Sequence, residues 1–134
     1  MKPVTGLLLI AHGARDPTWA TPFQEVVRRI RLSQPELQVA LSFLEFMSPG
    51  IEEAGHGLVA AGCTEVHVVP MFLGASGHVR RDVPPLIERL GLHYGSKVVW
   101  TQHVALGEAD AVMQAMADTT LAWLAAAQTS REAP

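Results

Sequence analysis

The chain alternates short apolar runs with segments of helical periodicity, and this alternation restricts the folds that it can adopt. The first run, Leu7–Ala11, is apolar throughout and ends at His12-Gly13. A run of this kind is typical of a strand in a parallel sheet that is covered on both faces. Further strands are predicted over residues 38–44, 65–70 and 97–101.

Helical patterns lie between and after these runs. Thr21-Pro22 offers a capping threonine followed by proline at the first helical position, and apolar residues then recur with helical spacing up to Ile30. Gly62 and Gly91 are expected to end two later helices. Helices are therefore predicted from Thr21 up to the break at residues 33–35, and over residues 48–62, 79–91 and 108–127.

Four strands that alternate with four helices predict an α/β fold with right-handed crossovers. We expect a single-domain three-layer sandwich, with helices on both faces of a four-stranded, mainly parallel sheet of order 2-1-3-4. Residues 1–128 would form this domain, and residues 129–134 a frayed tail. In such sheets ligands bind beyond the carboxyl ends of the strands, where the strand order reverses, which here lies between the first and third strands.

Composition excludes several other classes of protein. The chain has 134 residues, and its single cysteine, Cys63, cannot form an internal disulfide, a cysteine-rich zinc site or a cysteine-ligated cluster within one chain. Ten Lys and Arg against 13 Asp and Glu argue against nucleic-acid binding through bulk charge. The apolar runs are too short for a signal peptide core or a membrane span, so a cytoplasmic protein without a membrane partner is expected.

Polar residues follow three of the predicted strands at one edge of the sheet. His12 follows the first strand, Glu45 ends the second, and the loop after the third ends in Gly77-His78. Neighbouring strands lie about 4.8 Å apart, so both imidazoles could approach one ion, with the carboxylate on its other side. Two imidazoles and a carboxylate suit a divalent first-row metal. The alternatives are loop histidines bonded to backbone and a structural pair of Glu45 with Arg15.

Basic residues surround the same edge. Arg80 and Arg81 lie where the third helix is expected to begin, a position that disfavours cations and that an anionic ligand would offset. Together with Arg15 they could bind several carboxylates, and Phe72 with Met71 would form an apolar wall. The alternative is that these arginines are solvated or paired with neighbouring aspartates.

Other features carry less weight. The glycine-rich loops lack both the dinucleotide fingerprint and the Walker pattern. Of the remaining histidines, His103 follows the fourth strand and is a minor site candidate, whereas His56, His67 and His93 are expected to have packing or surface roles. The last helix is apolar on more than one side, which suggests a subunit interface.

Three motifs, in order and spacing, closely resemble the small CbiX type of sirohydrochlorin chelatase in the class II chelatase superfamily. They are Ile10–Pro17, Phe43–Glu45, and Val69–Leu73 followed by Gly77–Pro84, and the match covers roughly residues 5 to 125. One departure is Ala14, where the family usually has serine. That change removes a hydroxyl beside the key histidine.

The resemblance implies an ATP-independent lyase that inserts Co2+ or Fe2+, or Ni2+, into sirohydrochlorin for cobalamin or siroheme synthesis. His12 and His78 match the family's metal-binding and proton-accepting histidines, and Glu45 matches its active-site glutamate. A homodimer and no tightly bound cofactor are implied.

The metal ligands would therefore be His12, Glu45 and His78. Arg15, Arg80, Gly77 and Phe72 are expected to contact the tetrapyrrole. The rival hypotheses are a non-catalytic tetrapyrrole- or metal-binding protein of the same fold, and a flavodoxin-like signalling or nucleotide-binding module, which the absence of phosphate motifs disfavours.

Overall fold

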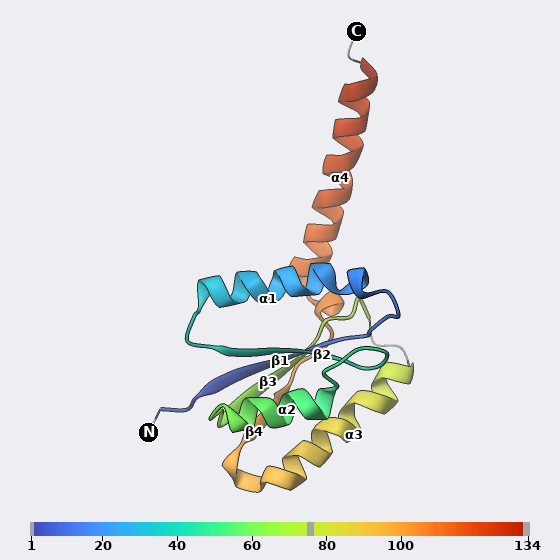
Figure 1. Ribbon diagram of the computed structural model, residues 1–134. Helices are drawn as coiled ribbons and strands as arrows, with labels where there is room; N and C mark the ends of the chain where they lie inside the picture. Colours follow the sequence, from blue (N-terminus) through green and yellow to red (C-terminus); the bar gives the residue numbers. More distant parts are fainter. Residues whose placement is uncertain (1, 75–76, 133–134) are drawn as a thin grey trace.

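The computed structural model describes residues 2–74 and 77–132, and of His78 it describes the backbone alone. The chain forms a parallel sheet flanked by helices (Figure 1). The strands are β1 (Thr5–Ala11), β2 (Gln38–Phe43), β3 (Glu65–Pro70) and β4 (Val99–Gln102). The helices are α1 (Thr21–Ser33), α2 (Ile51–Ala60), α3 (Gly77–Tyr94) and α4 (Asp110–Glu132), with short 3-10 turns at Pro17–Ala20, Gly95–Lys97 and Leu106–Glu108.

The strand order is β2-β1-β3-β4 and every pairing is parallel, which confirms the predicted topology. In register, Leu9 of β1 pairs with Leu41 of β2 and with Val69 of β3. Ala11 pairs with Phe43, so β1 and β2 end level with each other. The carboxyl ends of the two strands thus place the following residues, His12 and Leu44-Glu45, side by side.

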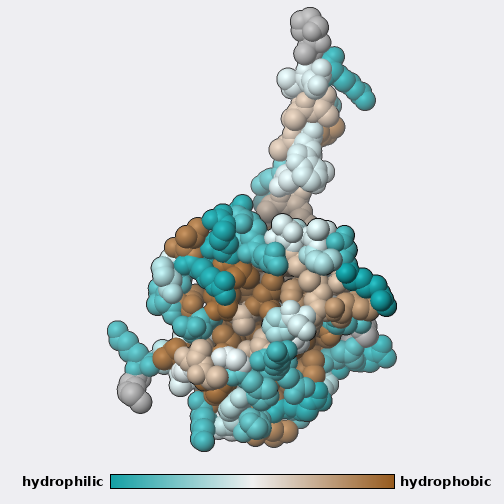
Figure 2. Space-filling model, in the orientation of Figure 1, coloured by the Kyte–Doolittle hydropathy of each residue, from teal (hydrophilic) through white to brown (hydrophobic). Residues whose placement is uncertain are grey.

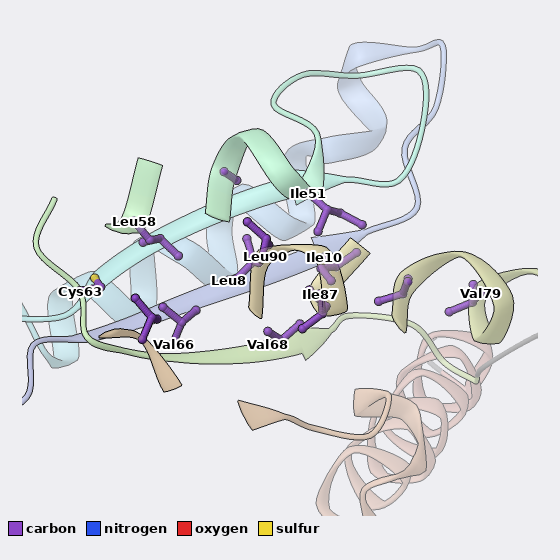
Figure 3. Packing of buried hydrophobic residues seen from close by; sticks show 13 residues of the cluster. Leu8, Ile10, Ile51, Leu58, Cys63, Val66, Val68, Val79, Ile87 and Leu90 are labelled. Carbon is purple, nitrogen blue, oxygen red and sulfur yellow. The ribbon is translucent and has the colours of Figure 1, made fainter. Parts of the chain in front are cut away.

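The main core lies between the sheet and the helices α2 and α3, on one face (Figure 3). It forms because alternate residues of β1 and β3 point to that face, where Leu8, Ile10, Val66 and Val68 are fully buried. The helices contribute Ile51, Ala54, Leu58, Val79, Val83, Ile87 and Leu90, and Cys63 and Val98 complete the cluster. Burial of this size is the chief source of stability in a parallel α/β fold.

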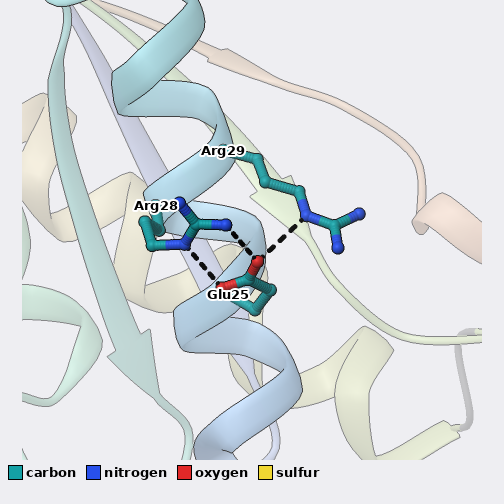
Figure 4. A network of polar contacts seen from close by, with 3 residues as sticks. All are labelled: Glu25, Arg28 and Arg29. Atoms are coloured by element: carbon teal, nitrogen blue, oxygen red, sulfur yellow. Dashed lines mark hydrogen bonds and ion pairs between the residues drawn. The ribbon is translucent and has the colours of Figure 1, made fainter.

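The other face carries α1. Val27 of α1 packs there with Leu9 and Val39, and Ala20 packs with Ala11 and Phe43. The solvent side of α1 is polar: the Glu25 carboxylate accepts hydrogen bonds from Arg28 at 2.6 and 2.8 Å and from Arg29 at 3.1 Å (Figure 4). Helices therefore cover both faces, as predicted.

Several helix boundaries differ from the predicted ones. Thr21 does not cap α1 but is its first helical residue, because a 3-10 turn precedes it and Asp16 caps that turn instead. α2 begins three residues later than Ser48, because the segment after β2 still pairs with it through Gly50.

The later helices are longer than predicted. α3 begins at Gly77, so Gly77-His78 is its first turn and not the end of a loop as predicted, and it continues through Gly91 to Tyr94. α4 continues past Ala127 to Glu132. Gly91 lies in helical backbone, and Gly95, with φ of +57°, takes the left-handed conformation that follows α3. No helix in the described ranges is long and apolar enough to cross a membrane.

Candidate active site

The centre of the site is a hydrogen bond between His12 and Glu45. The β1–β2 ladder continues past the ends of both strands, because the Leu44 N–H donates to Ala11 O and the Glu45 N–H donates to His12 O at 3.1 Å. This backbone pairing holds the two side chains together, and His12 Nε2 lies 2.9 Å from Glu45 Oε1. Both side chains are about 40% exposed (42% and 40%), so they face solvent and remain accessible to a ligand.

Gly13 permits this close approach. Its φ is +100°, and a Cβ atom at this position would lie 1.8 Å from the Glu45 carbonyl oxygen. A side chain at residue 13 is therefore excluded both by backbone conformation and by space. Gly13 is needed for the pairing of the His12 and Glu45 loops.

Arg15 and Phe46 flank the pair. The Arg15 guanidinium lies over the Phe46 ring, 4.8 Å from its centroid, and Phe46 is 59% exposed. Phe46 also adopts a left-handed backbone conformation with φ of 66°, which is uncommon for an aromatic residue. Glu45 pairs with His12, and Arg15 presents a cation on an exposed aromatic surface beside that pair.

An apolar hollow of about 440 Å³ opens at the same edge of the sheet. Phe72 forms part of its wall and meets the His12 ring edge to face, with 6.3 Å between centroids. Arg80 lines the hollow too, so two of the residues predicted to contact the substrate lie in one hollow. The remaining lining residues are Pro70, Val79, Val83, Pro84, Gln102, His103, Val104, Ala105 and Glu108.

Two other predicted residues lie in the first turns of α3, the helix that contributes Val79 and Arg80 to this hollow. Gly77 is the first residue of α3, and its carbonyl oxygen accepts a hydrogen bond from Arg81 Nε at 3.2 Å. Arg81 also lines a second hollow of about 370 Å³, together with Glu45 and Asp82. Glu45 and Arg81 thus line the same hollow.

His78 is the second residue of α3, and its side chain lies outside the described part of the structure. Within the part that is described, no three His, Cys, Asp or Glu side chains converge to hold an ion. Of the three predicted metal ligands, the structure describes the side chains of His12 and Glu45, and these two are in contact. The three-residue metal site remains a prediction.

The end of β4 and the segment after it contribute a wall that we did not predict. Gln102, Val104 and Glu108 line the hollow, and Gly107 N–H donates to Phe72 O at 2.8 Å. Its position in the sequence could have predicted this wall, because the segment follows a parallel strand, and ligands bind at the carboxyl edge of such a sheet. His103, the minor candidate, lines the hollow and also forms a 2.9 Å hydrogen bond with His67.

The remaining histidines have structural contacts. His67 Nε2 lies 3.1 Å from Glu65 Oε1 on the sheet. His56 Nδ1 lies 2.5 Å from the Tyr94 hydroxyl, which ties α2 to α3, and the His93 ring packs edge to face on both. These contacts agree with the packing and surface roles expected of them.

The site of this α/β protein is therefore a histidine–carboxylate pair beside an apolar hollow, at the carboxyl edge of a parallel sheet. The CbiX family profile matches residues 6–121. The chain belongs to the CbiX family, as its motifs predicted.

Relatives and solved structures agree with this assignment. The chain is 35% identical over 82 residues to the sirohydrochlorin cobaltochelatase of Saccharolobus solfataricus, and 32% identical over 96 residues to that of Methanothermobacter thermautotrophicus. These matches cover 61% and 72% of this chain, but 62% and 64% of the relatives, so the chain spans less than two thirds of their length.

Among solved structures, a CbiX protein of cobalamin (vitamin B12) biosynthesis from Marinobacter aquaeolei VT8 superposes with a TM-score of 0.76 at 26% identity, over 90% of this chain and 97% of that one. The sirohydrochlorin chelatase SirB from Bacillus subtilis, in complex with cobalt, superposes with a TM-score of 0.63 at 26% identity. That match covers 72% of this chain and 42% of SirB. The predicted chelatase-like fold is therefore confirmed.

Proposed function

We propose that this chain is a sirohydrochlorin chelatase that inserts Co2+ into the macrocycle. The observation that carries the proposal is the 2.9 Å contact between His12 and Glu45 at the carboxyl edge of the sheet, beside an apolar hollow, in a member of the CbiX family. The relatives in Saccharolobus and Methanothermobacter bear the name sirohydrochlorin cobaltochelatase, which supports the substrate and the metal.

The His12–Glu45 pair supplies the proton chemistry that metal insertion requires. Two pyrrole N–H protons must leave the macrocycle as the ion enters, and an imidazole takes up protons near neutral pH. Since a carboxylate accepts hydrogen bonds, Nε2 is the protonated nitrogen in the neutral ring, and Nδ1 carries the lone pair. Glu45 orients the ring, so that the imidazole can accept a proton or bind the incoming ion.

His78 is proposed as the second histidine of the reaction. It follows Gly77 at the start of α3, at the same edge of the sheet as His12. Two histidines allow one imidazole to hold the ion while the other accepts a ring proton. Glu45 then balances part of the charge of the ion.

The surroundings suit a large anionic ring. Sirohydrochlorin carries many carboxylates, and arginine pairs with carboxylates through a rigid, two-pronged donor set. Arg80 lines the hollow, and Arg15 lies over Phe46 beside the His12–Glu45 pair. We propose that these arginines bind the carboxylates while Phe72 contacts the apolar face of the macrocycle, close to Gly77.

The proposal also covers the identity of the metal, the cellular compartment and the biosynthetic pathway. Imidazole and carboxylate ligands accept several divalent ions, and SirB from Bacillus subtilis is known in complexes with cobalt and with Fe3+. We propose Co2+ as the main substrate, with Fe2+ as the alternative, in an ATP-independent cytoplasmic lyase of cobalamin or siroheme synthesis. Residues 1–128 would form its single domain.

We also propose that the protein is a homodimer. This chain matches only 42% of SirB, so the Bacillus chelatase has room for a second domain of similar size in the same chain. A second copy of this chain would take the place of that domain.

Absorbance spectroscopy tests the activity directly. Metal-free sirohydrochlorin with Co2+ should convert faster with the protein than without it, and His12→Ala, His78→Ala and Glu45→Gln should each lower the enzymatic rate by about 10²-fold or more. His93→Ala is the matched control, because it removes an exposed histidine from the opposite end of α3. That control should keep the wild-type rate.

Two results would contradict the proposal. A wild-type rate equal to the uncatalysed rate, with sirohydrochlorin or Co2+ still bound, would indicate a non-catalytic binding protein. Unchanged rates in all three site variants would show that the reaction takes place elsewhere on the molecule.

A further inference from the structure

A second group of polar side chains lies across the neighbouring parallel strands β3 and β4 (Figure 1). His67 of β3 pairs in register with Thr101 of β4. The ladder continues past the end of β4, because the His103 N–H donates to Val68 O at 2.9 Å. Alternate residues of a strand share a face, so Glu65, His67 and His103 all lie on the face opposite the main core.

The three side chains form a continuous set of hydrogen bonds. Glu65 Oε1 lies 3.1 Å from His67 Nε2, and His67 Nδ1 lies 2.9 Å from His103 Nε2. Because a carboxylate only accepts hydrogen bonds, Nε2 of a neutral His67 carries the proton and Nδ1 has the lone pair. Glu65 thus fixes the tautomer of His67 and directs its lone pair at the ring of His103.

This arrangement is the one in which histidine binds metal ions. Metal-binding histidines regularly donate their free N–H to a carboxylate, which sets the orientation of the ring. The nitrogens of His67 and His103 that face each other are also suitably spaced. With metal–nitrogen bonds of about 2.0–2.1 Å, nitrogens 2.9 Å apart subtend about 90° at the ion, the angle between neighbouring ligands in octahedral or square-planar coordination.

The surroundings leave room for an ion and its water. His67 and His103 line a hollow of about 340 Å³, whose other lining residues are Leu7, Val69, Val104, Ala105, Leu106 and Ala109. These residues are apolar, so the two imidazoles supply the polar side chains of the hollow. The side chain of His67 is 29% exposed and His103 is exposed, so water reaches both rings.

We propose that His67 and His103 bind a divalent transition-metal ion at a second site, with Glu65 as the positioning residue of His67. The ion replaces the hydrogen bond between the rings. The ring proton of His103 moves from Nε2 to Nδ1 through exchange with water, so both facing nitrogens offer a lone pair and both imidazoles stay neutral. Two protein ligands leave the other positions of the ion to water, so the ion is held loosely and exchanges readily.

The second site adjoins the proposed substrate hollow. His103 also lines the 440 Å³ hollow beside Phe72. An ion on His103 therefore lies at the rim of the hollow in which the macrocycle is proposed to bind, and is held there before insertion. This holding role rests on the proposed function, whereas metal binding by the two histidines does not.

His56 and His93 provide a comparison within the same chain. Their rings are also close, with 5.3 Å between centroids, but they meet edge to face. His56 Nδ1 is hydrogen-bonded to the Tyr94 hydroxyl, so this nitrogen is occupied. We expect this pair not to bind the ion.

Titration with Co2+ alone tests the second site. The starting protein is the full chain with His12→Ala and His78→Ala, which removes the proposed catalytic histidines. It should still bind one Co2+ per chain, measured by the visible absorption of the ion. In that background His67→Ala or His103→Ala should lower the affinity by about tenfold or more, whereas His93→Ala should leave it unchanged. No binding by the starting protein, or equal affinity in all variants, overturns the proposal.

NMR locates the bound ion. Co2+ is paramagnetic, so it should broaden the ring signals of His67 and His103 in the starting protein and leave those of His56 and His93 sharp. Broadening centred on His56 and His93 overturns the proposal. Circular dichroism checks that each variant is folded.

Variants of Glu65 test its positioning role. Glu65→Ala should lower the Co2+ affinity by about tenfold, because the ring of His67 is no longer held. Glu65→Gln should recover part of the loss, because its amide oxygen still accepts the hydrogen bond from Nε2. An affinity in Glu65→Ala equal to that of the starting protein overturns the role of Glu65.

Insertion kinetics test the holding role. With sirohydrochlorin, His67→Ala in the otherwise wild-type chain should raise the KM for Co2+ by about tenfold and keep kcat, because ion supply is impaired and the reaction step is not. An unchanged KM overturns the holding role. If the wild-type chain inserts no metal, the holding role and the proposed function both fail, and the Co2+ titration still decides whether the second site exists.

Discussion

At the residue scale, the site depends on one glycine that keeps two loops in contact. Gly13 has φ of +100°, and the space where a Cβ would lie is occupied by the backbone of Glu45. The His12–Glu45 hydrogen bond follows from this contact, because the loop pairing sets the separation of the two side chains. The chemistry of the site is therefore sensitive to a residue that has no side chain of its own.

Gly13→Ala is expected to destabilise the protein by roughly 2 kcal/mol or more, because backbone strain and a steric clash both raise the free energy of the folded state. It should also slow metal insertion, because the His12 and Glu45 loops must separate. Urea unfolding and the absorbance assay measure the two effects. Gly57→Ala is the control: Gly57 is an exposed helical glycine with open space around it, and alanine there should stabilise by about 0.5–1 kcal/mol. A Gly13→Ala protein as stable and active as wild type would show that the close approach is dispensable.

Cys63 illustrates how burial controls a single side chain. It is 2% exposed in the main core, and burial raises the pKa of its thiol above the ordinary value of 9.0. Since the thiolate is the reactive form, labelling by a thiol reagent should be negligible in the native protein at neutral pH and rapid in urea. Fast stoichiometric labelling without denaturant would show that this part of the core opens readily.

At the element scale, α1 combines a buried side with a charged outer side. Arg28 and then Arg29, by hydrogen bonding to Glu25, lower the pKa of its carboxyl from 4.5 to about 2 (Figure 4). A carboxyl whose pKa is lower in the folded state stabilises the protein above its unfolded pKa. Solvent screens this surface cluster, so its contribution is small.

The pH dependence of stability should reveal that contribution. The difference in melting temperature between wild type and Glu25→Gln is expected to be constant above pH 4.5 and to shrink as the pH falls toward 2, where the carboxyl becomes protonated. Thermal unfolding followed by circular dichroism across this range is the measurement. High salt should reduce the difference. A difference that grows as the pH falls would contradict this account.

At the scale of the whole molecule, the exposed apolar side chains of α4 (Figure 2) and the proposed homodimer connect stability to association. If two copies associate through these side chains, dimer formation is part of folding, and stability depends on protein concentration. The melting temperature of wild type should rise over a hundredfold range of concentration. That of Leu121→Asp with Leu124→Asp should stay constant and lie lower. Equal, concentration-independent melting of both proteins would contradict a dimer built through α4.

The sequence by itself determined the local pattern of this protein. Unbroken apolar runs and helical stripes predicted four strands and four helices, and β3 has the predicted bounds. Right-handed crossovers then left the strand order 2-1-3-4 as the expected one. His12 and Glu45 could be singled out because a polar residue at the end of a buried strand is visible in a short stretch of sequence.

Tertiary structure decided the features that depend on which surfaces meet. Examples are the left-handed backbone of Phe46, the placement of Arg15 over its ring, and the wall that the segment after β4 adds to the hollow. The projection of α4 belongs with them. Periodicity indicates which side of an element is apolar, but it does not indicate which surface covers that side, because the covering residues are distant in sequence.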